Sequence, residues 1–204
     1  MKASGTFHFQ EFLFLPYKTN CMRVIGGKLK SVRFEPPKNI PTRPTTDFAK
    51  EGLFNTLNNN YNFDNIKVLD LFGGTGSISY EFASRGCEDI TTVEIFPRCA
   101  DFIKKTALQH QLKAIKVLQM DVFRFMETAK QKFDVIFAGP PYPLPNLNTI
   151  PDLIFKNDLV EGQGWFILEH NPNHNFDNHP HFYKKKNYGT TIFSIFVNQV
   201  KKEA

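Results

Sequence analysis

The segment 68–76 has the residue types and the spacing to bind a nucleoside. Its apolar run ends in Asp70 and opens into three glycines: Gly73, Gly74 and Gly76. Because glycine has no Cβ atom, the backbone can pass close to a ligand there, and a helix beginning near Ser77 would turn its free amides toward that ligand. Asp70 is placed to take up a cationic amine or to orient the loop through water. Taken alone, a glycine-rich turn also fits a purely structural turn.

A second apolar run, residues 133–137, leads into Gly139, Pro140, Pro141 and Tyr142. The two prolines make a stiff corner, and the tyrosine adds an aromatic ring on which a planar base can stack. This segment predicts a pocket that holds a reacting amine.

Acidic residues at the ends of predicted strands strengthen the cofactor hypothesis. Glu94 follows the glycines by about twenty residues, where an acid can accept both hydroxyl protons of a ribose. Ile95 and Phe96 offer apolar walls for an adenine ring, and Asp121 ends the third strand within reach of the adenine amino group. Three acids at successive strand ends favour a site over unrelated surface residues. No phosphate-clamping lysine follows the glycines, which disfavours ATP and phosphorylated dinucleotides.

An alternation of strands and helices must position these residues. Strands are expected at 67–71, 90–94, 114–119, 133–137, 164–169, about 181–186 and 190–198. Helices are expected near 77–85, 98–110, 122–130 and 147–157. This order predicts an α/β fold, a Rossmann-like, seven-stranded, mostly parallel sheet with helices on both faces. Only residues 187–189 separate the last two strands, so these should form an antiparallel C-terminal hairpin.

The residues before the sheet predict a β-hairpin followed by a helix. From Met22 the chain reads as a short strand, a turn at Gly26 and Gly27, and a second strand over residues 28–30. A proline-rich linker then leads to a helix that one of three residues caps: Thr45, Thr46 or Asp47. The expected apolar face of this helix comprises Phe48, Leu53, Phe54 and Leu57.

Length and composition predict one main domain with an appendage. A chain of 204 residues, 41% of them hydrophobic, can bury one sizeable core. We expect an extension at 1–21, a basic hairpin and helix arm at 22–60, and the main domain at 61–204. Cys21, Cys87 and Cys99 are an odd number without metal-type spacing, which predicts reduced thiols and no metal site. No membrane span and no signal peptide are recognisable, so we expect a cytoplasmic protein.

The positive charge of the chain is concentrated in one segment. Between Met22 and Arg43 lie six basic residues and one acid, Glu35, and this excess equals the formal net charge of the whole chain, +5. A solvated hairpin surface would explain such a run. Its place beside a predicted nucleotide site favours an arm that contacts nucleic-acid phosphates. The predicted contacts are Arg23, Lys28, Lys30, Arg33 and Arg43.

Six short motifs together resemble one family. They are Met22-Arg-Val-Ile-Gly-Gly-Lys28, Thr42-Arg-Pro-Thr-Thr-Asp47, Glu51-Gly-Leu-Phe-Asn55, Asp70-Leu-Phe-Gly-Gly-Thr-Gly76, Val93-Glu94 and Pro140-Pro-Tyr142. The set is similar to the bacterial 16S ribosomal RNA (guanine(966)-N(2))-methyltransferase family, whose members are class I S-adenosylmethionine-dependent methyltransferases. The glycine motif fits any such enzyme, whereas the second motif joined to a basic hairpin is much more specific. The resemblance runs from Met22 almost to the C-terminus.

The resemblance implies S-adenosyl-L-methionine as the cofactor and 16S ribosomal RNA or the small ribosomal subunit as the partner, with no stable protein partner and no membrane. It implies that residues 70–76, Phe72 included, hold the methionine part of the cofactor. Glu94 would bind the ribose, with Ile95 beside the adenine and Asp121 on its amino group. Arg43, Pro44 and Thr45 would close over the site, while Pro140, Pro141 and Tyr142 would receive a flipped guanine.

The implied reaction transfers a methyl group in line from a sulfonium to an exocyclic amine. Such an amine is a poor nucleophile because its lone pair is delocalised into the ring, so the protein must hold and orient it. In enzymes of this kind an Asp or Asn side chain and the carbonyl of the following proline accept the two amine hydrogens. Gly139 stands at that position here and leaves the Pro140 carbonyl and Tyr142.

Two other functions remain open from the sequence. A DNA adenine or cytosine amino-methyltransferase would share the Pro-Pro-aromatic corner, although no separate target-recognition domain is visible. A catalytically silent RNA-binding or assembly factor would keep the fold and the basic arm, and Gly139 favours that alternative.

Three further groups have two interpretations each. His170, His174, His179 and His181 either bind a metal or, as their spacing favours, belong to a solvated loop. Glu169 ends the fifth strand near the expected base pocket, as a second acceptor or as a structural residue. Lys184, Lys185 and Lys186 either contact phosphates or protect the edge of an exposed hairpin.

Overall fold

The computed structural model describes residues 21–38, 40 and 45–198. The expectations for residues 1–20, Arg43 and Pro44 lie outside this part of the chain. Two small strands, β1 (Met22–Arg23) and β2 (Arg33–Phe34), form a separate hairpin. The main sheet contains β3 (Lys67–Leu71), β4 (Asp89–Glu94), β5 (Ile115–Gln119), β6 (Phe133–Ala138), β7 (Val160–His170), β8 (Phe182–Tyr188) and β9 (Thr191–Val197). The α-helices are α1 (Asp47–Asn58), α2 (Ser77–Ser84), α3 (Pro97–Gln109), α4 (Val122–Thr128) and α5 (Ile150–Lys156).

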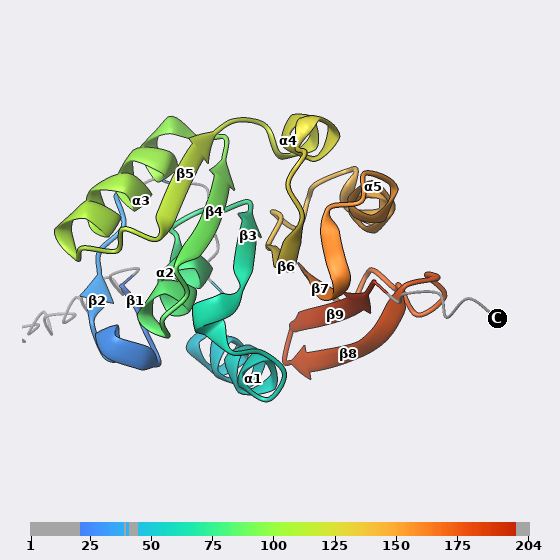
Figure 1. Ribbon diagram of the computed structural model, residues 1–204, viewed down its shortest axis with the longest axis horizontal. Helices are drawn as coiled ribbons and strands as arrows, with labels where there is room; N and C mark the ends of the chain where they lie inside the picture. The colour runs from blue at the N-terminus through green and yellow to red at the C-terminus, as the bar shows by residue number, and fades with distance from the viewer. Residues whose placement is uncertain (1–20, 39, 41–44, 199–204) are drawn as a thin grey trace, which may run out of the picture.

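The seven strands of the main sheet lie in the order β5-β4-β3-β6-β7-β9-β8 (Figure 1). The first five of these strands pair in parallel, and β9 pairs antiparallel with both β7 and β8. The predicted Rossmann-like sheet with an antiparallel C-terminal hairpin is therefore confirmed. Strand β3 lies between β4 on one side and β6 on the other, so the strand order reverses at β3. The loops after β3 and β6 meet at this point. Open α/β sheets bind ligands at such a reversal of strand order.

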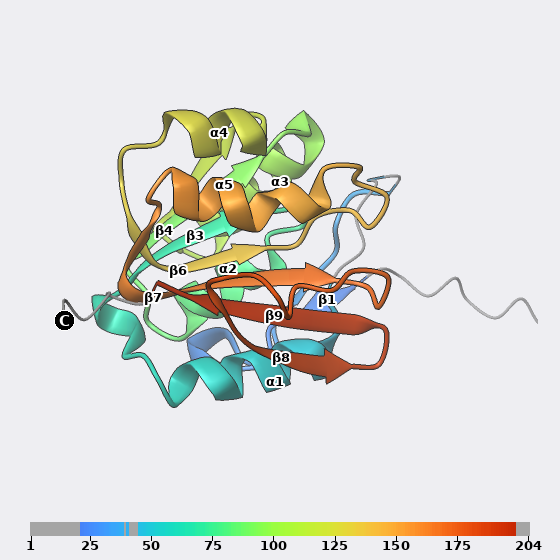
Figure 2. The same ribbon diagram turned by 90° about the vertical axis from the view of Figure 1, so that its right-hand side faces the viewer.

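Helices cover both faces of the sheet, and Figure 2 shows α4 and α5 on one side with α1 on the other. Residues of α1, α2 and α3 join one apolar cluster, together with Met22 and Phe34 of the hairpin. Residues of α4 and α5 join a second cluster. Successive strand residues point to opposite faces, so Val68 of β3 belongs to the first cluster and Leu69 to the second.

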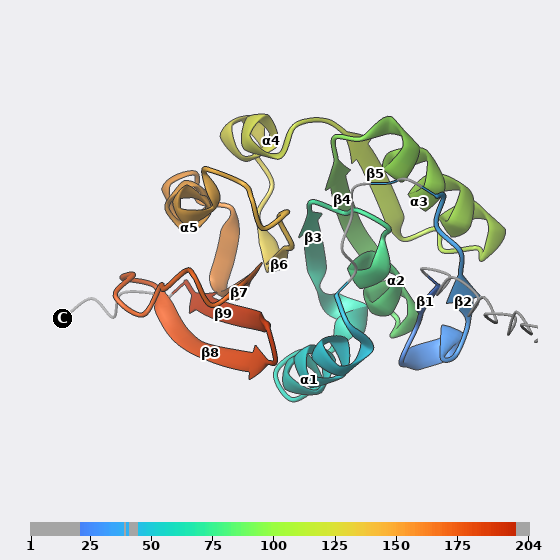
Figure 3. The same ribbon diagram turned by 180° about the vertical axis from the view of Figure 1, so that it is seen from behind.

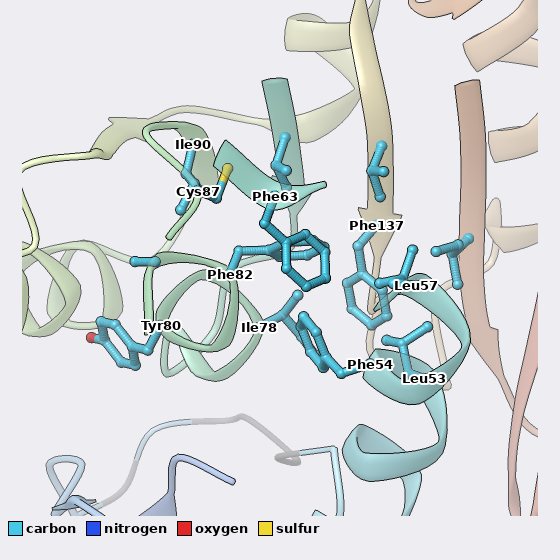
Figure 4. Packing of buried hydrophobic residues seen from close by; sticks show 14 of the residues in the cluster. Leu53, Phe54, Leu57, Phe63, Ile78, Tyr80, Phe82, Cys87, Ile90 and Phe137 are labelled. Atoms are coloured by element: carbon cyan, nitrogen blue, oxygen red, sulfur yellow. The ribbon is translucent and has the colours of Figure 1, made fainter. Parts of the chain in front are cut away.

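Aromatic rings fill the centre of the first cluster (Figure 4). The ring of Phe54 from α1 lies 4.9 Å from that of Phe82 from α2 and 6.2 Å from that of Phe63, measured between centroids. All three side chains are almost fully buried. Edge-to-face packing of this kind stabilises a core beyond its area burial, and it joins α1 to the body of the fold.

The N-terminal hairpin differs from the prediction. Its two strands pair, but a 3-10 helix, Gly27–Leu29, stands where the sequence predicts the second strand. The cause is packing against the end of α2, shown in Figure 3 beside β1 and β2. The Ser84 hydroxyl donates to the Gly26 carbonyl at 2.6 Å and accepts from the Leu29 amide at 2.9 Å. A Cβ atom at Gly27 would lie 1.9 Å from the Ser84 carbonyl oxygen, so only glycine fits.

Helix α1 begins as predicted, since the Thr46 side chain accepts a hydrogen bond from the Ala49 amide. The predicted apolar face is wrong at Phe48, which is 68% exposed. Its ring meets the edge of the Tyr188 ring at a centroid distance of 5.4 Å. Lys50 takes an inward position instead and is only 1% exposed. A charged residue was not predicted there because its partners come from distant parts of the chain.

Those partners form a buried ionic network that joins the hairpin, α1 and α2. Glu81 of α2 is fully buried and pairs with Lys50 and Arg85. It also accepts a hydrogen bond from the Ile25 amide at 2.8 Å, and the Lys50 ammonium donates to the Arg23 carbonyl. Buried charges are tolerated only when they are paired and hydrogen-bonded. The network therefore fixes the hairpin against the helix that follows the glycine turn.

Three boundaries in the C-terminal half also differ. β7 begins at Val160 and is longer than predicted, and the expected helix at 147–157 divides into a 3-10 helix, Leu147–Thr149, and α5. His170 ends β7, is 1% exposed and has its Nε2 atom 2.8 Å from the Ser194 hydroxyl. The favoured solvated-loop interpretation is wrong for this histidine because the strand continues through it.

Candidate functional site

The turn between β3 and α2 forms one side of the candidate site. Phe72, Gly74 and Gly76 adopt φ angles of 62°, 55° and 81°, in the left-handed region that favours glycine. A Cβ atom at Gly76 would lie 2.7 Å from Cζ of Tyr80, and one at Gly73 would lie 2.4 Å from Cγ2 of Thr92. The shape of the turn and its packing thus require glycine at these positions, which the sequence predicts as cofactor contacts.

Asp70 lies beneath this turn and is 2% exposed. Its Oδ2 atom accepts hydrogen bonds from the amide of Ser79 at 3.1 Å and from the Ser79 hydroxyl at 2.5 Å. Burial raises the pKa of the Asp70 carboxyl to about 7, although the hydrogen bonds from Ser79 act to lower it. The structure thus joins Asp70 directly to α2, whereas the sequence predicted contact with a cationic amine or orientation of the loop through water. Ser79 was not predicted, since its spacing from Asp70 matches no motif.

Glu94 connects the glycine turn to the loop after β4. Its side chain ends β4 and is 4% exposed. One carboxylate oxygen accepts from the Gly74 amide and the other from the Phe96 amide, each at 2.7 Å. Each carboxylate oxygen has a second lone pair, so the same group can also accept two ribose hydroxyls.

The residues after β4 and β5 fit the rest of a nucleoside. Ile95 and Phe96 are 49% and 48% exposed, an apolar pair directly beside the buried acid. Asp121 caps α4, where one of its oxygens accepts from the Arg124 amide at 2.9 Å, and its side chain is exposed. This set of groups is chemically suited to S-adenosylmethionine. It offers one carboxylate for the ribose hydroxyls, an apolar surface for the adenine ring and a second carboxylate for the adenine amino group.

The Pro-Pro-Tyr corner adjoins this turn. The Gly139 amide donates to the Leu71 carbonyl at 3.2 Å, which joins the end of β6 to the end of β3. Pro140 is buried, Pro141 is exposed and Tyr142 is half-buried. The glycine turn and the Pro-Pro-Tyr corner therefore lie side by side at the carboxyl edge of the sheet.

Glu169 stands next to the corner. Ala138 of β6 pairs with Leu168 of β7 in parallel register, so the residues that follow them, Gly139 and Glu169, are neighbours. The Glu169 side chain is 5% exposed, and one of its oxygens accepts from the Thr45 hydroxyl at 2.6 Å. Thr45 was predicted near the cofactor, whereas the structure places its hydroxyl on Glu169. No sequence pattern links residues 45 and 169.

The residues of the basic arm lie at different distances from the candidate site. Arg23 and Arg33 are directly opposite each other in the hairpin, and Arg23 pairs with Asp47 at the start of α1 at 2.9 Å. Lys28 lies in the 3-10 helix that packs against Ser84 at the far end of α2. Since α2 begins at the glycine turn, its far end is at the opposite edge. The arginines therefore lie nearer the site than Lys28.

A cavity of about 480 Å³ also lies at that opposite edge, with Lys28, Glu88 and Lys113 in its lining. The cavity is lined by none of the predicted cofactor or amine-pocket residues.

The described part of the chain holds no group of three or more His, Cys, Asp or Glu side chains able to bind a metal. Burial raises the pKa of the Cys87 and Cys99 thiols to about 11, so both are protonated at neutral pH. No helix among the described residues is long and apolar enough to cross a membrane.

Comparison with known sequences identifies the family. The sequence model of a family described as conserved hypothetical protein 95 matches residues 22–197. The chain belongs to this family. A relative from Bacillus subtilis, named as a putative rRNA methyltransferase, is 33% identical over 73% of this chain and 82% of the relative. A relative from Buchnera aphidicola, named ribosomal RNA small subunit methyltransferase D, is 27% identical over 74% of this chain and 77% of the relative.

A solved structure shares the fold of this chain. A hypothetical protein from Thermus thermophilus is 26% identical and superposes with a TM-score of 0.77, covering 88% of this chain and 99% of that chain. The family to which the six motifs pointed is confirmed, and the chain is a methyltransferase of that family. The match begins at Met22, the first residue of the motif set.

Proposed function

We propose that this family member transfers a methyl group from S-adenosylmethionine to the exocyclic N2 amine of a guanine in 16S ribosomal RNA, within the cytoplasm. The observation that carries the proposal is the Gly139–Leu71 hydrogen bond, which sets the amine corner directly beside the nucleoside turn. The names of the relatives support ribosomal RNA as the substrate. The choice of guanine N2 rests on the motif resemblance.

The cofactor would supply an electrophilic methyl group on a sulfonium. The backbone of residues 72–76 would hold its methionine part, Glu94 its ribose hydroxyls, and Ile95 and Asp121 its adenine. Asp70 would act on the cofactor through the turn, because its carboxylate is buried against Ser79. The Pro140 carbonyl would accept one amine hydrogen while Tyr142 stacks on the base, an arrangement that accelerates transfer by orientation.

The RNA would approach over the edge that carries Arg23 and Arg33. In this proposal residues 22–60 form an RNA-contacting arm, which the Glu81 network fixes to the methyltransferase domain. Lys28 and Lys30 lie farther along the same arm and would contact phosphates outside the flipped nucleotide. Phosphate contacts of this kind position the RNA without reading its sequence.

The decisive test is transfer of a tritiated methyl group to small ribosomal subunits that lack the modification. Digestion of the RNA and mass spectrometry of its nucleosides would identify the product. Subunits that already carry the modification are the matched control. The proposal predicts N2-methylguanosine in the unmodified subunits alone. A methylated adenosine or cytidine would contradict the assigned base, and tritium in DNA but not in RNA would favour the amino-methyltransferase of DNA.

One observation favours a second candidate, a catalytically silent factor that binds ribosomal RNA. Gly139 removes the side chain that usually accepts an amine hydrogen. A protein of this kind would bind S-adenosylmethionine and small subunits with no tritium in any nucleoside. Calorimetry with the cofactor, run beside the transfer assay, separates a silent member of the family from an enzyme with a different substrate.

A further inference from the structure

We propose that Glu169 supplies the side-chain acceptor that the Pro-Pro-Tyr corner lacks at Gly139. In this inference, which rests on the proposed amine methylation, the Glu169 carboxylate and the Pro140 carbonyl each accept one hydrogen of the target amine. Glu169 then replaces, from the neighbouring strand, the group that other members carry within the motif.

The parallel register of β6 and β7 sets Glu169 beside Gly139. A Cβ atom built on Gly139 would lie 3.8 Å from the Oε2 atom of Glu169, which is ordinary van der Waals contact. An oxygen of Glu169 therefore borders the place from which an Asp or Asn side chain at position 139 would start.

The Glu169 carboxylate lies in buried, partly aromatic surroundings. Glu169 is 5% exposed, and across the sheet it pairs with Phe193, whose ring centroid lies 6.1 Å from that of Phe137. A buried carboxylate beside aromatic rings requires hydrogen-bond donors. Thr45 donates to one oxygen at 2.6 Å, and a carboxylate can accept from several donors at once. A base amine entering the corner is a donor of the right chemistry.

Glycine at position 139 is compatible with a carboxylate at position 169. A Cβ at residue 139 would approach Cε1 of Phe137 to 3.1 Å, which requires the ring to shift. An aspartate at that position would also bring a second carboxylate against Glu169. Two carboxylates that share one site repel each other, and one of them is driven toward its protonated form. Glycine at 139 avoids both the contact and the repulsion.

The reaction step balances with Glu169 in this role. The amine lone pair forms the new nitrogen–carbon bond, and the methyl–sulfur bond breaks with its electron pair retained on sulfur, which becomes neutral. The methylated nitrogen then releases one proton. The Glu169 carboxylate, hydrogen-bonded to that nitrogen, accepts the proton and passes it to water, which regenerates the carboxylate.

Single-turnover methyl transfer to small subunits tests the inference with two variants. Glu169→Met keeps the length of the side chain but has no acceptor, and its rate should fall about ten- to a hundredfold. Glu169→Gln keeps an acceptor oxygen and should retain a rate of methyl transfer within about fivefold of the native protein, because the proton leaves only after the methyl–sulfur bond has broken and water can then accept it directly. Cofactor affinity by calorimetry and the melting temperature should change little in either. Equal rates for Glu169→Met and the native protein would overturn the proposal.

An acceptor moved back to position 139 provides the matched test. The double variant Gly139→Asp with Glu169→Met should be at least about tenfold faster than Gly139→Ala with Glu169→Met. Both carry the extra Cβ, so they differ only in the carboxylate. Equal rates would show that the two positions do not share a role. Absence of transfer by the native protein would instead remove the proposed function, and this inference with it.

Discussion

Glu94 is the last residue of β4 and Glu169 the last but one of β7, and the two acids are similarly buried, yet their hydrogen-bond partners differ in kind. Glu94 accepts two backbone amides, those of Gly74 and Phe96. Glu169 accepts the side-chain hydroxyl of Thr45. In the proposed function this difference separates a cofactor half, whose acid belongs to the framework of the turn, from a base half, whose acid accepts a side-chain hydroxyl. We expect substitutions in the first half to affect folding and cofactor binding together, and substitutions in the second half to affect RNA binding or catalysis while cofactor binding stays unchanged.

Glu94→Ala should have the largest effect. It removes the acceptor of two amides and should lower the free energy of unfolding by about 2 kcal/mol or more. The affinity for S-adenosylmethionine, measured by calorimetry, should fall at least about tenfold because the ribose loses its acceptor. Glu127→Ala, an exposed acid on α4, is the control. Unchanged affinity in Glu94→Ala would place the cofactor elsewhere.

Arg33→Glu should affect only the base half. The exposed Arg33 lies in the hairpin opposite Arg23, so charge reversal should weaken binding to small subunits about five- to tenfold and flatten its dependence on salt. Cofactor affinity should not change. Lys28→Glu, at the opposite edge, should have a smaller effect in the same filter-binding assay. Equal losses in the two variants would mean that RNA covers the whole arm, and no loss in either would mean that it binds elsewhere.

Asp70→Asn should change how the stability of the protein depends on pH. The pKa of Asp70 in the folded protein, about 7, lies above its ordinary value of 3.8. The native state therefore binds the proton more tightly than the unfolded state, and the contribution of Asp70 to stability falls as the pH rises from about 4 to about 7. Asparagine does not titrate. Urea unfolding at several pH values measures the free energy of unfolding of both proteins. Between about pH 5 and about pH 8 this free energy should rise in the variant, relative to the native protein, by more than about 1 kcal/mol. A constant difference would contradict the raised pKa.

Thr45→Val should have the smallest effect. It removes the hydroxyl that holds Glu169, so the carboxylate loses orientation but remains in the corner. We expect a rate of methyl transfer about three- to tenfold lower, or about 1 kcal/mol, with an unchanged melting temperature. Thr45→Ser keeps the hydroxyl and should behave as the native protein. A fall in cofactor affinity rather than in rate would contradict this prediction. It would favour the role predicted from the sequence, in which Thr45 binds the cofactor.

The cofactor half could largely be predicted from the sequence because its groups are close in the chain and follow strand ends. The glycine turn, Glu94 and Asp121 all lie at the carboxyl edge, as expected from alternating strands and helices. The inward lysine, Lys50, could not be predicted, since its acceptors come from α2 and the hairpin. The exposure of Phe48 has the same cause, because Tyr188 of a distant strand receives its ring.

The base half could be predicted only in part. The Pro-Pro-Tyr segment marked the corner, but the meeting of Thr45, Gly139 and Glu169 depends on the register of β6 with β7 and on the start of α1. Register between strands that are separated by a helix leaves no local pattern. From the sequence, Gly139 is predicted to lack the side chain that usually accepts an amine hydrogen. The fold places the Glu169 side chain beside Gly139.

The most direct test of this account is a crystal structure of the chain with S-adenosylhomocysteine and an RNA stem-loop that carries the target guanine. The account predicts the guanine N2 atom within about 3.2 Å of both a Glu169 carboxylate oxygen and the Pro140 carbonyl oxygen. A guanine bound in the corner with N2 more than about 4 Å from Glu169, beyond hydrogen-bond distance, would contradict it.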